Sequence, residues 1–165
     1  MPHPISAIGY VHTLVSLVPF FAGLYGFARY GAILTTRLSG KLYVGGICLS
    51  ALTALLISSS GGFNIAHVVS LVIMVIALAS LVTPKLGWLG RGRPYLTTFA
   101  LSFSYLLSLV PATNETLSRL PPSAPLAQGP QSPIVVHFLM LWAVLFVIGF
   151  AVQCWKIYRK GANVH

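Results

Sequence analysis

Long apolar segments separated by short polar ones run through the whole chain. Five such segments carry few charges, at about 8–28, 42–59, 64–83, 95–112 and 134–155. An α-helix needs about 20 mostly apolar residues to cross the hydrocarbon core of a bilayer. The pattern therefore predicts an all-α fold, a polytopic membrane protein whose five transmembrane helices form one domain over residues 1–165.

Small and polar side chains recur within the first segment at steps of three and four residues. They are His12, Ser16, Pro19, Gly23 and Gly26. These steps follow one face of a helix, and small residues let two helix backbones approach closely. We therefore expect this face to pack against the other helices.

The connection between the fourth and fifth segments differs in composition from the rest of the chain. Residues 113–133 are rich in Pro and Ser and contain few large apolar side chains. Such a composition is typical of an extended loop exposed to water. We expect an external loop there, with room for a short helix around residues 115–120.

The overall composition excludes a soluble globular domain. The chain is 56% hydrophobic and 7% charged, and its mean hydropathy is +0.87. Cys48 and Cys154 both lie inside predicted spans, so they do not indicate the disulfide framework of a secreted protein. The first ten residues, MPHPISAIGY, lack a basic region, so we expect no cleavable signal peptide.

The charge is strongly one-sided, with ten basic residues against a single acid, Glu115. The basic residues lie in short connections between apolar spans, a pattern that membrane topology explains and that argues against nucleic acid as a partner. Five spans place nine of the ten basic residues on one side and only Arg119 on the other. Basic residues accumulate on the cytoplasmic side, so we expect a bacterial inner-membrane protein with its N-terminus outside and its C-terminus in the cytoplasm.

Three histidines share one depth in this topology. His12, His67 and His137 each lie near the start of an odd-numbered span, and Glu115 follows the end of the fourth span. All four therefore lie near the outer surface, within about one helical turn of 5.4 Å. Ionisable residues inside a membrane usually mark a functional site, although a histidine near a helix end can also be satisfied by water and headgroups.

Imidazole and carboxylate groups are ligands for haem iron and for transition metals such as Zn, Cu or Fe. We therefore predict an outward-facing site in which His12 and His67 bind haem b or a metal ion. His137 and Glu115 would complete or support the ligand set. Polar neighbours that would orient these groups are Asn64, Asn114, Ser16 and Arg119.

Three stretches of the sequence resemble a bacterial family of predicted membrane proteins known only as a domain of unknown function. They are HTLVSLVPFFAGLYGFARYG, RLSGKLYVGGICLSALTALLISSSGGFNIAHVVSLV and FALSFSYLLSLVPATNETLSRLPP, within residues 10–122. The matching positions are His12, the Gly40-Lys41-Leu42-Tyr43-Val44 entry to the second span, His67, Asn114-Glu115-Thr116, Arg119 and Pro121.

The chain departs from the family pattern at two cytoplasmic positions. Thr36 stands where the family usually has a histidine before Gly40, and Arg91-Gly92-Arg93-Pro94 replaces a stretch that often holds another. A version with four histidines would resemble a membrane cytochrome with two haems. The resemblance therefore implies that this chain keeps the outer pair alone.

Two other functions are compatible with the sequence. One is a non-catalytic accessory subunit or assembly factor of a larger membrane complex, whose partners would be other subunits or further copies of this chain within the lipid bilayer. The other is a carrier for a small solute. The spans show no inverted repeat and no charge at the membrane midplane, two features that argue against a carrier.

The topology is testable with reporter fusions. A reporter that is active only in the cytoplasm, fused after His165, should give signal, because the basic connections hold the C-terminus on that side. A reporter that is active only in the periplasm should give none at the same position. The opposite pair of results would reverse the predicted orientation.

Overall fold

The computed structural model describes residues 6–57 and 62–162, and within these ranges the regular structure is entirely helical. The α-helices are α1 (Ala7–Tyr30), α2 (Leu38–Leu55), α3 (Ile65–Val82), α4 (Arg93–Arg119) and α5 (Pro133–Ala162). Two 3₁₀ helices, η1 (Thr83–Lys85) and η2 (Gly87–Gly92), join α3 to α4. Each α-helix belongs to a segment long and apolar enough to cross a membrane, which confirms the all-α fold with five spans.

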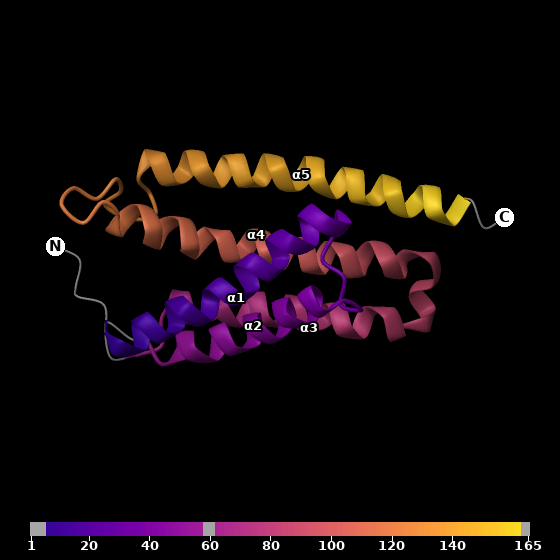
Figure 1. Ribbon diagram of the computed structural model, residues 1–165, viewed down its shortest axis with the longest axis horizontal. Helices are drawn as coiled ribbons and strands as arrows, with labels where there is room; N and C mark the ends of the chain where they lie inside the picture. Colours follow the sequence, from indigo (N-terminus) through magenta and orange to yellow (C-terminus); the bar gives the residue numbers. More distant parts are fainter. Residues whose placement is uncertain (1–5, 58–61, 163–165) are drawn as a thin grey trace.

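The helices run lengthwise beside one another, and each packs mainly on its neighbours in sequence (Figure 1). The pairs α1–α2, α2–α3, α3–α4 and α4–α5 form the main contacts, and α5 lies along α4 at one side. Up-and-down packing of this kind brings the end of each odd-numbered helix to the same end of the bundle as the start of each even-numbered helix. We call this the basic end, because it carries Arg29, Arg37, Lys41, Lys85, Arg91, Arg93, Lys156, Arg159 and Lys160.

Several helix boundaries differ from the prediction, and α5, for example, continues to Ala162 rather than ending at residue 155. Helix α2 begins at Leu38 rather than residue 42, and it ends at Leu55, whereas the predicted end at residue 59 falls outside the described residues. Hydropathy marks the apolar centre of a span, whereas the backbone hydrogen bonds that define a helix continue into the polar interface. Lys41 illustrates this, because its N–H donates to the carbonyl of Arg37, the N-cap residue.

The predicted end of the fourth span at residue 112 was wrong. Helix α4 continues through Pro111 to Arg119, so the expected short helix around residues 115–120 is its last turns. A proline removes only its own N–H from the helix ladder, and a packed transmembrane helix tolerates that loss. An ion pair between Glu115 and Arg119, four residues apart, supports the extension.

The connection from α4 to α5 folds back on the helix end instead of extending away from it. The N–H of Ala127 donates to the carbonyl of Leu117, and the N–H of Leu126 donates to that of Leu120. Ala127 is buried as a result. The loop therefore caps the end of the bundle opposite the basic end.

The small-residue face predicted for α1 is confirmed. Pro19, Gly23 and Gly26 are the buried residues of this helix. A β-carbon on Gly46 of α2 would lie 2.7 Å from Cδ of Pro19, so only glycine lets the two helices approach this closely. A β-carbon on Gly23 would lie 2.5 Å from the Tyr105 ring of α4.

Two tyrosines connect α1, α2 and α4 at the centre of the core. Tyr43 is fully buried, and its hydroxyl donates to Oγ of Ser104 over 2.8 Å, because the Ser104 proton is directed to the carbonyl of Leu101. The hydroxyl of Tyr105 donates to the carbonyl of Phe20 over 3.2 Å. Each phenol thus has a hydrogen-bond partner, which a buried polar group requires.

The close contact between α1 and α2 can be tested with neighbouring glycines. Gly46→Ala should lower the free energy of unfolding by about 1–3 kcal/mol, because the added methyl group overlaps the Pro19 ring. Gly45→Ala is the matched control, since a β-carbon there would meet no atom within 4 Å. Thermal unfolding of both variants in mild detergent gives the comparison, and equal midpoints would contradict this packing.

Candidate functional site

His12 belongs to a polar cluster between α1 and α2. Its Nδ1 lies 3.0 Å from Oγ1 of Thr53, and its Nε2 lies 3.4 Å from Oγ of Ser16. Oγ of Ser16 lies 2.7 Å from that of Ser50, so the cluster joins two side chains from each helix. The periodic face of α1 places His12 and Ser16 one turn apart, and α2 supplies Ser50 and Thr53 at the matching spacing.

The hydrogen-bond network assigns the proton on the neutral His12 ring. Thr53 donates its hydroxyl proton to backbone carbonyls of its own helix, so its oxygen accepts from Nδ1–H of His12. Ser16 donates to the carbonyl of His12 over 2.7 Å, so Ser50 donates to Ser16. The lone pair of the neutral ring is then on Nε2, whose only neighbour in the cluster is the long Ser16 contact.

His67 has a different role, as part of the N-terminal cap of α3. Its Nδ1 accepts from the backbone N–H of Asn64 over 3.0 Å, and the Asn64 side chain accepts in return from the N–H of His67. Its Nε2 donates to the carbonyl of Ile57 over 2.9 Å. A backbone N–H can only donate and a carbonyl can only accept, so this neutral ring has no lone pair left for a ligand.

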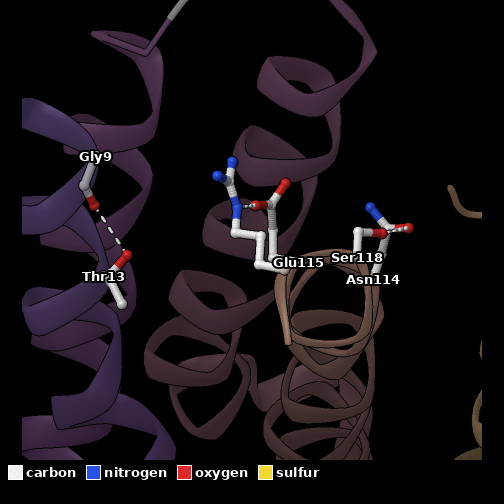
Figure 2. A network of polar contacts seen from close by, with 6 residues as sticks. Gly9, Thr13, Asn114, Glu115 and Ser118 are labelled. Carbon is white, nitrogen blue, oxygen red and sulfur yellow. Dashed lines mark hydrogen bonds and ion pairs between the residues drawn. The ribbon is translucent and has the colours of Figure 1, made fainter. Parts of the chain in front are cut away.

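Glu115 has its cationic partner within its own helix. Its Oε2 accepts from Nε of Arg119 over 2.6 Å, and its side chain is 60% exposed. Figure 2 shows that Glu115 and the neighbouring Asn114–Ser118 pair leave α4 in different directions. The contacts of the described residues include no hydrogen bond between Glu115 and His12.

His137 is exposed at the start of α5. Its Nδ1 donates to the carbonyl of Pro133 over 2.7 Å, a contact within the first turn of its own helix. Helix α5 packs mainly on α4, so it brings His137 to neither the α1–α2 cluster nor the cap of α3. The shared depth of the three histidines therefore does not make them neighbours.

The predicted ligands do not fit a haem or a metal ion in this arrangement. Among residues 6–57 and 62–162, no three His, Cys, Asp or Glu side chains are grouped closely enough to hold one metal ion. His67 would have to give up a cap hydrogen bond before it could coordinate. Of the predicted set, His12 and the exposed His137 each keep a ring nitrogen without a close partner, but they lie on helices that do not bring them together, and the haem or metal site stays a prediction.

Several polar contacts join helices that sequence patterns did not pair. Gln153 of α5 is buried, accepts from Ser102 of α4 over 2.9 Å and donates to the carbonyl of Gly31 over 2.9 Å. One side chain thus ties α5 to α4 and to the α1–α2 loop. The glutamine within an otherwise apolar span could have predicted this contact from the sequence, because an amide in lipid requires a hydrogen-bond partner from a neighbouring segment.

Comparisons with known proteins give no family assignment. The chain matches no family model, no curated protein and no solved structure. The resemblance to a family of unknown function therefore stays a prediction, and the side-chain geometry carries the functional argument.

The cap role of His67 predicts a large loss of stability on its removal. His67→Ala should lower the free energy of unfolding by about 2 kcal/mol or more, because the N–H of Asn64 and the carbonyl of Ile57 lose their partner. His137→Ala is the control, since that ring is exposed and bonds only to its own first turn. Equal unfolding midpoints for the two variants would contradict the cap role.

Proposed function

We propose that this chain is a non-catalytic accessory subunit or assembly factor of a larger membrane complex. Its contribution would be helix surface rather than reactive side chains. Support comes from the three histidines and the lone acid of the predicted site, each of which already has a hydrogen-bond or ion-pair partner within this chain. A cofactor-binding site would instead leave several ligand atoms directed at one point.

The main support for this proposal is an exposed glycine on α5. Gly149 lies near the middle of this helix, and a β-carbon there would meet no atom within 4 Å. Glycine weakens a helix relative to alanine, so its presence on a bare face is unexplained by packing within the chain. In membranes, small residues occur where two helix backbones come together, and this role fits Gly149.

Gly45 of α2 has the same property. It is exposed, and a β-carbon there would also meet no atom within 4 Å. Its neighbour Gly46, by contrast, is needed for the contact with Pro19 inside the chain. Two separate helices therefore present a glycine outward, as a subunit with neighbours on more than one side would.

The chain would act within a lipid bilayer, and its five apolar helices, each long enough to span a membrane, support this. We further propose that the bilayer is a bacterial inner membrane, with α1 starting outside and α5 ending in the cytoplasm. The collection of nine basic residues at one end of the bundle supports this orientation.

A haem- or metal-binding function is the second candidate. The loosely held Nε2 of His12 favours it. It requires His67 to leave its cap, or ligands to come from a second chain. Both routes predict a cofactor in the purified protein.

The assembly role is testable by comparing membranes that contain single variants. Solubilised in mild detergent, the wild-type chain should migrate in a species larger than the purified chain alone. Gly149→Leu should shift most of the chain out of that species, because the longer side chain blocks close helix approach. Val147→Leu is the control, since it is 64% exposed on the same helix but about 200° around it.

Three outcomes would reject this function. The first is a chain that migrates alone in wild-type membranes, and the second is an equal shift for both α5 variants. The third is an absorption spectrum or elemental analysis that shows stoichiometric haem or metal, lost in His12→Ala. The third result would establish the competing function.

A further inference from the structure

A cavity opens at the basic end, between the α1–α2 loop and the start of α4. Its volume is about 490 Å³. Figure 1 shows that the connection from α3 to α4 extends beyond the α1–α2 loop at this end. The cavity lies in the resulting step, with loop residues on one side and η1, η2 and α4 on the other.

The lining of the cavity combines apolar and polar residues. Its accessible apolar surface comes from Leu34, Pro84 and Pro94, whereas Ile33 and Leu101 belong to the protein core, with exposed fractions of 2% and 1%. The polar residues of the lining include Arg93, Thr35, Thr36 and Thr98. The hydroxyl groups of these three threonines have no hydrogen-bond partner among the described residues. A ligand that matches this lining is an amphiphile with a hydrogen-bond acceptor in its polar part.

Arg93 has donors available for such a ligand. Its Nε donates to the carbonyl of Gly90 over 3.0 Å, and its Nη1 makes a long contact of 3.5 Å with that of Pro84. Nη2 has no hydrogen bond to the described residues. These backbone contacts hold the guanidinium in place at the cavity while leaving one edge open to an anion.

The chain supplies no carboxylate side chain to neutralise this end. Its only acid, Glu115, lies about 33 Å further along α4 at 1.5 Å per residue. That carboxylate is already paired with Arg119. An anion that pairs with Arg93 is therefore not an acidic side chain of this protein. Anionic lipid headgroups are the main anions at a membrane surface.

We propose that this cavity binds an anionic phospholipid. The phosphate oxygens accept from Arg93 and from the threonine hydroxyls, and part of an acyl chain covers the exposed apolar residues of the lining, Leu34, Pro84 and Pro94. The site would hold one lipid against the step between the α1–α2 loop and α4. It would thereby fill a gap in the bundle that no side chain of the described residues covers.

The test uses the full chain, purified in a neutral detergent and stripped of lipid. Native mass spectrometry measures the apparent Kd for phosphatidylglycerol and for phosphatidylcholine, which carry the same phosphodiester but differ in net charge. Wild-type protein should bind phosphatidylglycerol more tightly. Arg93→Gln should weaken that binding about tenfold, the effect of losing one charge-assisted hydrogen bond, and Arg93→Lys should restore part of it.

Two further variants separate the cavity from general surface charge. Lys160→Gln removes the same charge at the same end but lies outside the lining, so it should leave the Kd within twofold. Thr98→Phe keeps every charge and fills the cavity, so it should weaken binding as Arg93→Gln does. Unfolding midpoints in detergent establish that each variant is folded before its Kd is compared.

Four results would overturn the proposal. They are equal affinity for the two lipids, equal losses for Lys160→Gln and Arg93→Gln, unchanged binding in Thr98→Phe, and full displacement of the lipid by millimolar inorganic phosphate. The last result would assign the site to a free anion. None of these readouts depends on the assembly state of the chain, so failure here and failure of the proposed function are distinguishable.

Discussion

Lipid gives helices almost no hydrophobic reason to associate, so this bundle depends on places where two backbones come close enough for extensive van der Waals contact. The main one is the Pro19 ring of α1 lying over Gly46 of α2. Gly23, one turn further along α1, admits the Tyr105 ring from α4. These positions set the direction of α1 across the bundle, and that direction decides which polar side chains meet.

Polar side chains in the spans then act mainly as connections between helices. Tyr43 bonds to Ser104, His12 to Thr53, and Gln153 joins three segments at once. A polar group in hydrocarbon is costly without a partner, so each partnership also excludes alternative registers of the helices. His12 and His67, whose positions predicted a ligand site, both make such connections in this structure.

The two ends of the molecule have different electrostatic character. At the end opposite the basic end, the lone acid pairs with Arg119 and a folded loop covers the end of α4. At the basic end, nine cations have no carboxylate side chain among them, and a cavity lies between helices of unequal reach. The lone carboxylate thus has its partner within the chain, whereas the cations of the basic end have no acidic side chain to pair with.

Much of the fold could be predicted from sequence, because lipid allows few solutions to the burial of a backbone. The five spans follow from apolar length, and the packing face of α1 follows from the spacing of Pro19, Gly23 and Gly26. The end of α4 was missed because Pro111 resembles a helix stop. Tertiary packing and the Glu115–Arg119 pair carry the helix past it.

The candidate site was predicted less well. The sequence gives the depth of a residue in the membrane, but contact also depends on which helices are neighbours and how each is rotated. Sequence placed His12, His67 and His137 at one level, and it determined that this level would be polar. Only the tertiary structure decided their partners, since the Ile57 carbonyl and the Thr53 hydroxyl reach the rings through helix rotation and loop path. The cavity beside Arg93 likewise arises from helices of unequal length, a property of the assembled bundle that no single segment contains.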